Sequence, residues 1–194
     1  MAAVDDTTTA PRRGRRLSED RSEVILGTVL DLINETGYDQ LRMQDVADKA
    51  GVGLSTIYRR WPTKQEVLRA ALQCESSAED RFPDTGDPRA DVAATLAGLA
   101  EGLNGDGAQT MLGFLATMRS EPEVAEIVRD TMLDPLHLHL RGLLAQVLGD
   151  DHPDLDLRAS AGPAILTYTA AICGKPMDAP AIADRLAELL LTPG

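Results

Sequence analysis

Apolar residues recur along most of the chain at spacings of three and four, which place them on one face of an α-helix. The first stripe consists of Ile25, Val29, Leu32 and Ile33, and Gly37 ends it. Runs that alternate apolar and polar residues, as half-buried strands do, are absent from the sequence. The pattern therefore predicts an all-α fold of about nine helices.

Breaks in this periodicity predict the domain organisation. Residues 1–17 show no periodicity and are expected to form a disordered, arginine-bearing arm, with Ser18 capping the first helix. The segment Phe82–Asp87 is rich in Pro, Gly and Asp, and we interpret it as a domain boundary. We therefore expect a helical N-terminal domain over 18–80 and a larger helical domain over 81–194.

Two predicted helix starts carry a capping box, in which Ser or Thr is followed three positions later by Glu. Thr63 and Glu66 open a helix that runs toward Leu72, and Ser120 and Glu123 open another. In such a box the hydroxyl accepts the backbone N–H of the glutamate, and the carboxylate accepts the N–H of the Ser or Thr. Both helices are therefore expected to begin with satisfied backbone donors.

The most specific pattern lies in Arg42–Leu68, which reads RMQDVADKAGVGLSTIYRRWPTKQEVL. Two helices, around 43–50 and 54–60, are too short to be stable alone and must support each other. Ala47 is small where the helices would cross closely, and Gly51 suits a positive φ in the turn between them. Together with an isoleucine ten residues after Ala47, this spacing predicts a helix-turn-helix. In such motifs the second helix enters the major groove of DNA.

The region around 18–75 resembles the DNA-binding domain of the TetR family of bacterial transcriptional regulators. The matching segments are Gly37-Tyr38, Asp45-Val46-Ala47, Ala50-Gly51-Val52, Thr56-Ile57-Tyr58-Arg59-Arg60-Trp61-Pro62 and Lys64-Gln65-Glu66. Beyond this region the resemblance rests on two short motifs, Pro83-Asp84-Thr85-Gly86 and Gly174-Lys175-Pro176. The resemblance implies a DNA-binding regulator, most often a repressor, whose C-terminal domain binds a small-molecule inducer.

The resemblance also implies which residues contact DNA. Ser55 and Thr56 would meet base edges or nearby phosphates, whereas Tyr58 and Lys64 would contact phosphates. The full set of expected DNA-binding residues is Arg42, Gln44, Leu54, Ser55, Thr56, Tyr58, Arg59, Arg60 and Lys64.

Two positions depart from the family pattern. Arg42 stands where Ser or Thr usually caps the second helix, so a cap worth roughly 1 kcal/mol is missing, although the Arg could reach a phosphate instead. Gly53-Leu54 replaces a more usual Ser-Lys, so a polar contact is lost, and Leu54 could touch a thymine methyl group. These departures motivate an alternative function, a dimeric small-molecule-binding protein with weak or lost affinity for DNA.

Charge is divided unevenly between the two expected domains. The net charge is −12; residues 1–75 carry 11 Lys and Arg against 12 Asp and Glu, whereas residues 76–194 carry 8 against 19. Positive residues cluster at Arg12–Arg16 and at Arg59–Lys64. The arginine arm could lie along DNA or remain a solvated tail. The acidic C-terminal domain would be repelled from DNA, which leaves the helix-turn-helix as the attractive surface.

The apolar segments of the C-terminal domain contain candidate residues for an inducer pocket. Methionine suits an adaptable pocket, although each such residue could equally belong to the core. Aromatic residues make up only 3% of the chain, which favours an aliphatic or compact ligand over a stacked aromatic one. The candidates are Met111, Phe114, Met118, Met132, His137 and Tyr168.

The last two predicted helices, Leu157–Cys173 and Asp178–Leu191, are expected to form a four-helix interface in a homodimer. The two recognition helices would then lie roughly 34–36 Å apart, or a multiple of that distance, and read a palindromic operator. Coupling between ligand and DNA is expected where the helix over Thr63–Leu72 touches the C-terminal domain.

Several other classes are disfavoured by what the sequence lacks. Nucleophile elbows and Gly-rich phosphate loops are absent, so we expect neither an enzyme nor a cofactor. His137 and His139 point roughly 200° apart around a helix, which disfavours a shared metal ion. The apolar runs are too short to span a membrane, and Met1–Arg16 has no apolar core of a secretory signal. Cys74 and Cys173 have no metal-binding spacing and fit unpaired thiols, so we expect a cytoplasmic protein.

Overall fold

The computed structural model describes residues 13–76, 82–104 and 107–192, and these residues form helices joined by loops and turns, without a strand. In chain order the elements are α1 (Arg13–Thr36), α2 (Met43–Ala50), α3 (Leu54–Tyr58), α4 (Lys64–Ser76), α5 (Pro88–Leu103), α6 (Gly107–Ser120), α7 (Pro122–Val128), the π-helical turn η1 (Arg129–Leu133), α8 (Asp134–Leu148), α9 (Leu155–Thr167), the π-helical turn η2 (Tyr168–Ile172) and α10 (Ala179–Leu191). Because α7, η1 and α8 are continuous, as are α9 and η2, the described part of the chain has nine separate helical rods. The predicted all-α class is confirmed.

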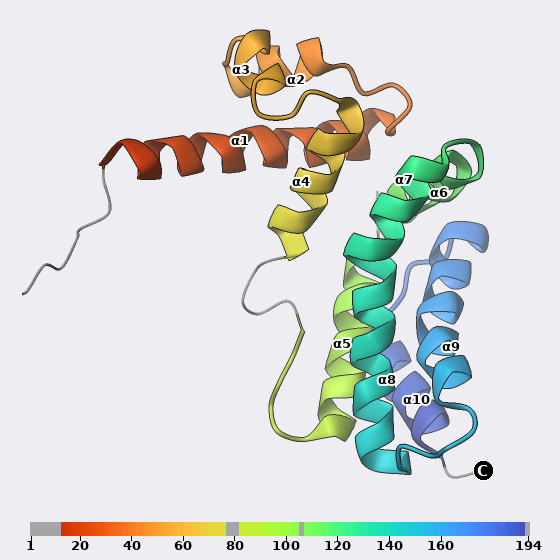
Figure 1. The fold of residues 1–194 in the computed structure, drawn as a ribbon. Helices are drawn as coiled ribbons and strands as arrows, with labels where there is room; N and C mark the ends of the chain where they lie inside the picture. The colour runs from red at the N-terminus through yellow and green to blue at the C-terminus, as the bar shows by residue number, and fades with distance from the viewer. Residues whose placement is uncertain (1–12, 77–81, 105–106, 193–194) are drawn as a thin grey trace, which may run out of the picture.

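The helices form two parts of different shape. Figure 1 shows α1 crossing the top of the molecule, with α2 and α3 on its outer side and α4 descending from it. We call these four helices, residues 13–76, the head. Helices α5, α8, α9 and α10 run alongside one another in the body, residues 82–192, and α6 and α7 lie at its upper end beside the C-terminal end of α1 (Figure 1).

The first helix begins earlier than the sequence predicts. It starts at Arg13, so residues 13–17, which were expected in a disordered arm, are helical and Ser18 does not cap the helix. No proline follows Pro11 in this stretch, and Arg and Leu are good helix formers, so nothing there ends the helix. The expected arm over residues 1–12 lies outside the described residues. At the other end, Gly37 terminates α1 as predicted, with φ of 84°.

The two capping boxes predicted from the sequence have opposite outcomes. The capping box of α4 is formed. Glu66 N–H donates to Thr63 Oγ1, and Thr63 N–H donates to Glu66 Oε2, both at a distance of 3.1 Å. The predicted capping box at Ser120 is wrong: Glu121 occupies the N-cap position, and the Ser120 hydroxyl donates back to the carbonyl of Thr117 at 3.1 Å. That backward bond competes with capping, as is common for Ser near helix ends.

The body encloses its own hydrophobic core. Its centre consists of side chains from α5, α8 and α9 that are fully buried, among them Leu96, Leu140, Leu144 and Leu166. Leu186 and Leu190 of α10 close this core on one side. The amphipathic faces predicted for these helices therefore pack together.

The core of the head, in contrast, is completed by the body. Fully buried Ile25, Val46 and Ile57 come from α1, α2 and α3. The same cluster includes four buried residues of α6 and α7: Phe114, Val124, Ile127 and Val128. The core thus crosses the domain boundary expected between residues 80 and 81, so the head does not bury its apolar surface alone.

None of the helices in the described ranges is both long enough and apolar enough to cross a membrane.

We expect Thr63→Ala to lower the free energy of unfolding by about 1 kcal/mol, because the N–H of Glu66 loses its acceptor at the start of α4. Thr63→Ser keeps the hydroxyl and should stay within about 0.5 kcal/mol of the wild type. Urea denaturation followed by circular dichroism measures both. Equal losses in the two variants would show that this hydroxyl does not stabilise the helix start.

Candidate nucleic-acid interface and cavity

The helix-turn-helix consists of α2, the turn at residues 51–53 and α3. Gly51 adopts φ of 65° and ψ of 34°, the left-handed conformation that glycine accommodates without strain. The N–H of Val52 donates to the carbonyl of Ala47 at 3.0 Å and closes the end of α2. Ala47 and Ile57 are buried where the two helices meet. The corner predicted from Ala, Gly and Ile at this spacing is therefore present.

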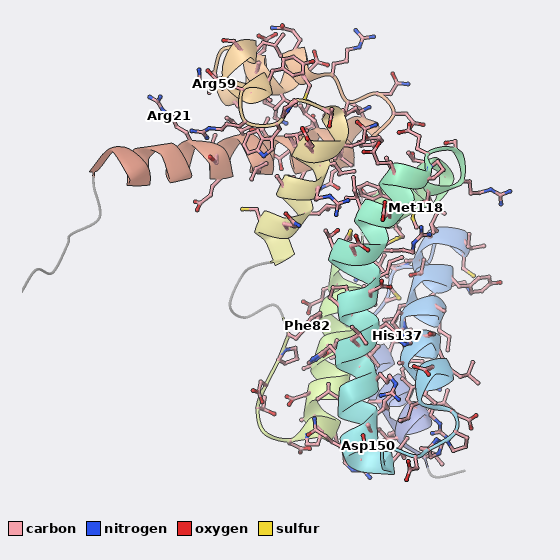
Figure 2. All side chains as sticks on the ribbon, in the orientation of Figure 1. Arg21, Arg59, Phe82, Met118, His137 and Asp150 are labelled. Carbon is pink, nitrogen blue, oxygen red and sulfur yellow. The ribbon has the colours of Figure 1, made fainter. Side chains whose placement is uncertain are left out.

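The residues expected to contact DNA divide into two groups by exposure. Those with exposed side chains are Arg42, Gln44, Ser55, Tyr58 and Arg59, and those half-buried are Leu54, Thr56, Arg60 and Lys64. Figure 2 shows Arg59 on the side of the head that faces away from the body, with Arg21 of α1 on the same side. The head thus presents basic side chains at the end of the molecule opposite Asp150 (Figure 2).

The start of α2 lacks a side-chain cap, as the sequence predicts. Arg42 occupies the N-cap position with extended backbone angles and makes no capping hydrogen bond. Its guanidinium is therefore not engaged in capping. Gln44, two residues later, donates from Nε2 to Asp48 Oδ1 at 2.9 Å along the exposed side of α2.

Two of the expected DNA-binding cations have partners within the head. Arg60 Nη1 donates to Ser22 Oγ and so joins the end of α3 to α1. Lys64 Nζ lies 4.1 Å from the centre of the Tyr38 ring and donates to the carbonyl of Asp39 at 3.4 Å. Burial lowers the pKa of Lys64, and the carboxylates of Glu121 and Asp39 oppose this shift. Both side chains therefore help to fix the helices of the head in addition to any role on DNA.

Arg21 is a candidate DNA-contacting residue that the sequence analysis missed. It lies with Val24 of α1 beside Val52, Gly53 and Thr56, around a depression of about 450 Å³ next to the start of α3. This depression exists because the turn of the helix-turn-helix packs against α1. The sequence offered no signal for it beyond the charge of Arg21.

A cavity lies between head and body, and we call it the boundary cavity. Its volume is about 360 Å³, within the range of about 300–1,000 Å³ that is usual for small-molecule sites. Helices α1 and α4 of the head and α5, α6 and η1 of the body form its walls. The lining residues are Leu30, Ile33, Asn34, Leu72, Leu99, Gly102, Leu103, Gly107, Thr110, Met111, Phe114 and Met132.

A second cavity of about 240 Å³, the side cavity, adjoins the first. The two share Leu99, Met111 and Met132 in their walls. The side cavity extends toward the start of the body, where Phe82 forms part of its wall. Its remaining lining residues are Pro83, Ala94, Thr95, Gly98, Leu133 and Leu136.

Three of the six residues expected to bind a ligand line these cavities, namely Met111, Phe114 and Met132. The other three do not. Met118 packs in the head cluster near the end of α6, and Tyr168 is exposed on η2. His137 faces α9, where its Nε2 donates to Asp156 Oδ1 at 3.1 Å (Figure 2). Helical periodicity placed all three on apolar segments but could not tell which neighbour each segment faces.

His139 supports the wall of the side cavity, which the sequence did not predict. Its ring stacks on Phe82 with the centroids 4.3 Å apart and the planes 9° apart. The hydroxyl of Thr95 donates to the carbonyl of Asp91 at 2.7 Å, so His139 Nε2, 3.2 Å away, donates to that hydroxyl. Burial lowers the pKa of His139, although Asp91 and Asp84 act in the opposite direction.

Polar contacts between described side chains join the head to the body, among them the following three. The Thr110 hydroxyl donates to Asn34 Oδ1 at 2.8 Å, between α6 and α1. The Thr117 hydroxyl donates to Asp39 Oδ1 at 3.0 Å, between α6 and the loop after α1. The third contact pairs Arg69 of α4 with Asp130 of η1 at 3.5 Å. This last pair is exposed, so we expect it to contribute less than about 1 kcal/mol.

Comparison with known proteins agrees with this architecture. Residues 25–71 match the family described as bacterial regulatory proteins, tetR family, and residues 82–190 match the tetracyclin repressor-like C-terminal domain. The chain is 28% identical over 178 residues to the DNA-binding transcriptional repressor TetR of Mycobacteroides abscessus, covering 89% of this chain and 93% of that protein.

Solved structures share the fold at lower identity. FadR from Bacillus subtilis, crystallised in complex with stearoyl-CoA, aligns with a TM-score of 0.69 and 18% identity, over 87% of this chain and 97% of that one. A TetR transcription regulator from Haloarcula marismortui aligns with a TM-score of 0.69 and 18% identity, over 89% and 97% of the two chains.

A helix-turn-helix head on an all-helical body, with pockets at their boundary, is the architecture of a DNA-binding regulator. The chain belongs to the TetR family of bacterial transcriptional regulators, which are typically ligand-responsive repressors.

The environment of His139 predicts a pH dependence of stability. Because burial lowers its pKa in the folded protein, the unfolded chain binds more protons below about pH 7, and stability falls as the pH drops through the ordinary histidine pKa of about 6.5. We expect His139→Gln to lose less stability than the wild type between about pH 7.5 and about pH 5.5. Urea denaturation at several pH values measures this, and parallel profiles for the two proteins would contradict it.

Proposed function

We propose that this regulator binds a palindromic operator as a homodimer and is released from it by a small molecule bound between head and body. One observation carries the proposal. The helices α1 and α4, which hold the helix-turn-helix in place, also form walls of the boundary cavity. A ligand in that cavity would therefore contact the elements that orient the recognition helix α3.

The surface of the head supports an operator-binding role. Ser55, Tyr58 and Arg59 are exposed on or directly after α3, where side chains of a recognition helix meet bases and phosphates. Arg42 and Arg21 would add phosphate contacts on either side. The half-buried Leu54 and Thr56 would face base edges only where the groove approaches the helix closely.

The charge distribution also supports an orientation in which the head, and not the body, faces DNA. Residues 76–194 carry 8 basic against 19 acidic residues, so the body is repelled by the phosphate backbone. Asp150 lies at the end of the body farthest from Arg21 and Arg59 (Figure 2). In the part of the chain that the structure describes, the head offers DNA the exposed basic side chains of Arg21, Arg42 and Arg59.

Exposed apolar side chains on the last helices support a homodimer. Leu157 of α9 is 69% exposed, Tyr168 and Ile172 of η2 are 59% and 64% exposed, and Leu189 of α10 is 62% exposed. Large apolar residues gathered on neighbouring elements are typical of interaction surfaces. A second copy that covers them would form the four-helix interface expected from the sequence.

Release by an inducer requires the ligand to prefer one arrangement of head and body. A ligand with equal affinity for both arrangements would not change DNA binding. The position of the boundary cavity satisfies this requirement, because any movement of α1 or α4 relative to α6 changes its walls.

Selection from a random pool of duplexes should enrich a palindrome whose affinity falls steeply with salt concentration. We expect Arg59→Ala to weaken binding to all duplexes and to reduce the slope of log affinity against log salt by about 1. Thr56→Ala should instead change the preferred base at one position, with an effect of about 1–3 kcal/mol.

Arg89→Ala is the matched control, because Arg89 is an exposed arginine at the start of α5 in the body. It should leave both affinity and slope unchanged. Fluorescence anisotropy at several salt concentrations measures all three variants. If the pool enriches no sequence and the wild type shows no salt-dependent binding, the alternative of a small-molecule-binding protein without DNA affinity is favoured.

The double variant Tyr168→Asp, Ile172→Asp should convert the dimer to a monomer. Burial of each apolar side chain contributes about 1.5–3 kcal/mol, so we expect dimerisation to weaken by roughly a hundredfold or more. Leu115→Asp, on an exposed position of α6, is the control and should leave the dimer intact. Size-exclusion chromatography with light scattering measures the mass, and a dimer that persists in the double variant would refute this interface.

A further inference from the structure

The walls of the boundary and side cavities indicate the chemistry of the ligand. Among the described residues that line them, none carries an ionisable side chain; the polar ones are Asn34, Thr95 and Thr110. A charged group placed against these described walls would lose part of its hydration without gaining a counter-ion from them. An uncharged ligand therefore suits the described walls of these cavities better than a carboxylate or a phosphate does.

The two polar side chains among the described residues of the boundary cavity wall are hydrogen-bonded to each other. Thr110 of α6 donates its hydroxyl proton to Asn34 Oδ1 of α1 at 2.8 Å, and both residues belong to the cavity wall. Asn34 lies in the head and Thr110 in the body. This hydrogen bond is therefore a tie between the two parts that a ligand in the cavity can reach.

The other two ties differ in this respect. The Thr117–Asp39 and Arg69–Asp130 contacts also join head and body, but none of these four residues lines the boundary or the side cavity. A ligand in the cavities would meet the first tie directly and the other two only through movement of the helices.

The two cavities together favour an elongated ligand. They share Leu99, Met111 and Met132, and the side cavity continues from there to Thr95 and Phe82. Gly98 and Gly102 lie in the walls, and a Cβ added at either would meet no atom within 4 Å. Both glycines are exposed, so this side of α5 is open to solvent and adds no side chain to the cavity walls.

We infer that the inducer is an uncharged, elongated, mainly aliphatic molecule with a hydroxyl or similar group, and that this group competes for the hydrogen bond between Thr110 and Asn34. The inference rests on the proposed function, since it names the ligand class and the trigger of the same site. A ligand hydroxyl that binds Thr110 replaces the tie between α6 and α1. The ligand therefore binds more tightly to arrangements in which the head has moved, and it shifts the protein toward them.

The test uses the full chain with 1-hexanol, 1-octanol and 1-decanol as uncharged probes and with decanoate as the charged probe. Binding of each probe is measured in the absence of DNA, as the change in the midpoint of thermal unfolding. We expect 1-decanol to raise the unfolding midpoint, and decanoate at the same concentration and neutral pH to leave it unchanged. Gly102→Leu, which fills open space in the cavity wall, should abolish the effect of 1-decanol.

The trigger is tested by the affinity for the selected duplex with and without 1-decanol. In the wild type we expect 1-decanol to weaken binding at least about tenfold, a usual size for coupling between two sites. Thr110→Val keeps the shape of the side chain but removes the hydroxyl, and its affinity should change less than about twofold with 1-decanol. Thr117→Val removes a tie on the same helix outside the cavity, and its response to 1-decanol should match that of the wild type.

Each contrary result overturns a defined part of the inference. Stabilisation by decanoate equal to that by 1-decanol, or no stabilisation by any of the three alcohols, would refute the ligand class. An equal loss of response in Thr110→Val and Thr117→Val would refute the trigger. If 1-decanol stabilises the wild type but not Gly102→Leu, and no duplex binds, the ligand class stands and the proposed DNA-binding function fails.

Discussion

Burial of the inner surface of the head against α6 and α7 is the interaction on which the rest of the structure depends. Phe114, Val124, Ile127 and Val128 belong to the body by sequence, yet they complete the core that holds α1 to α4 together. Each such side chain contributes about 1.5–3 kcal/mol when buried, more than any of the exposed polar ties between the two parts. The orientation of the helix-turn-helix relative to the body is therefore set by the packing of the head against α6 and α7.

The parts of the molecule that the sequence predicted well are those determined by neighbouring residues. Gly51 and Ala47 are four positions apart, and the capping box of Thr63 spans three, so their geometry follows from local backbone chemistry. The failure at Ser120 is also local, since its hydroxyl had the carbonyl of Thr117 within reach and bonded to that instead. Helical periodicity identified the apolar faces of the helices correctly. It could not predict which neighbouring helix each face packs against.

The cavity residues illustrate this limit. Met111, Phe114 and Met132 were proposed from residue type and line the cavities, whereas Asn34 was not proposed, because it meets Thr110 from 76 positions away. His137 and Tyr168 were assigned to a ligand although one contacts α9 and the other is exposed. An apolar helix can face a cavity, a neighbour or a second copy with the same pattern of residues, and only the packing of distant helices distinguishes these.

The π-helical turn η1 has a consequence for how such a protein can diverge. A π turn holds one residue more than the α-turn it replaces, and one residue corresponds to about 100° of rotation around a helix. Arg129–Leu133 carries Asp130 toward α4 and Met132 into the cavities, directly between α7, which packs in the head core, and α8, which packs in the body. Loss of a single codon in this segment would let the π turn become an ordinary α turn, which changes the side chains that it presents to the cavities while α7 and α8 keep their faces toward head and body. Inducer preference could thus change in one genetic step, without any substitution in the DNA-binding head.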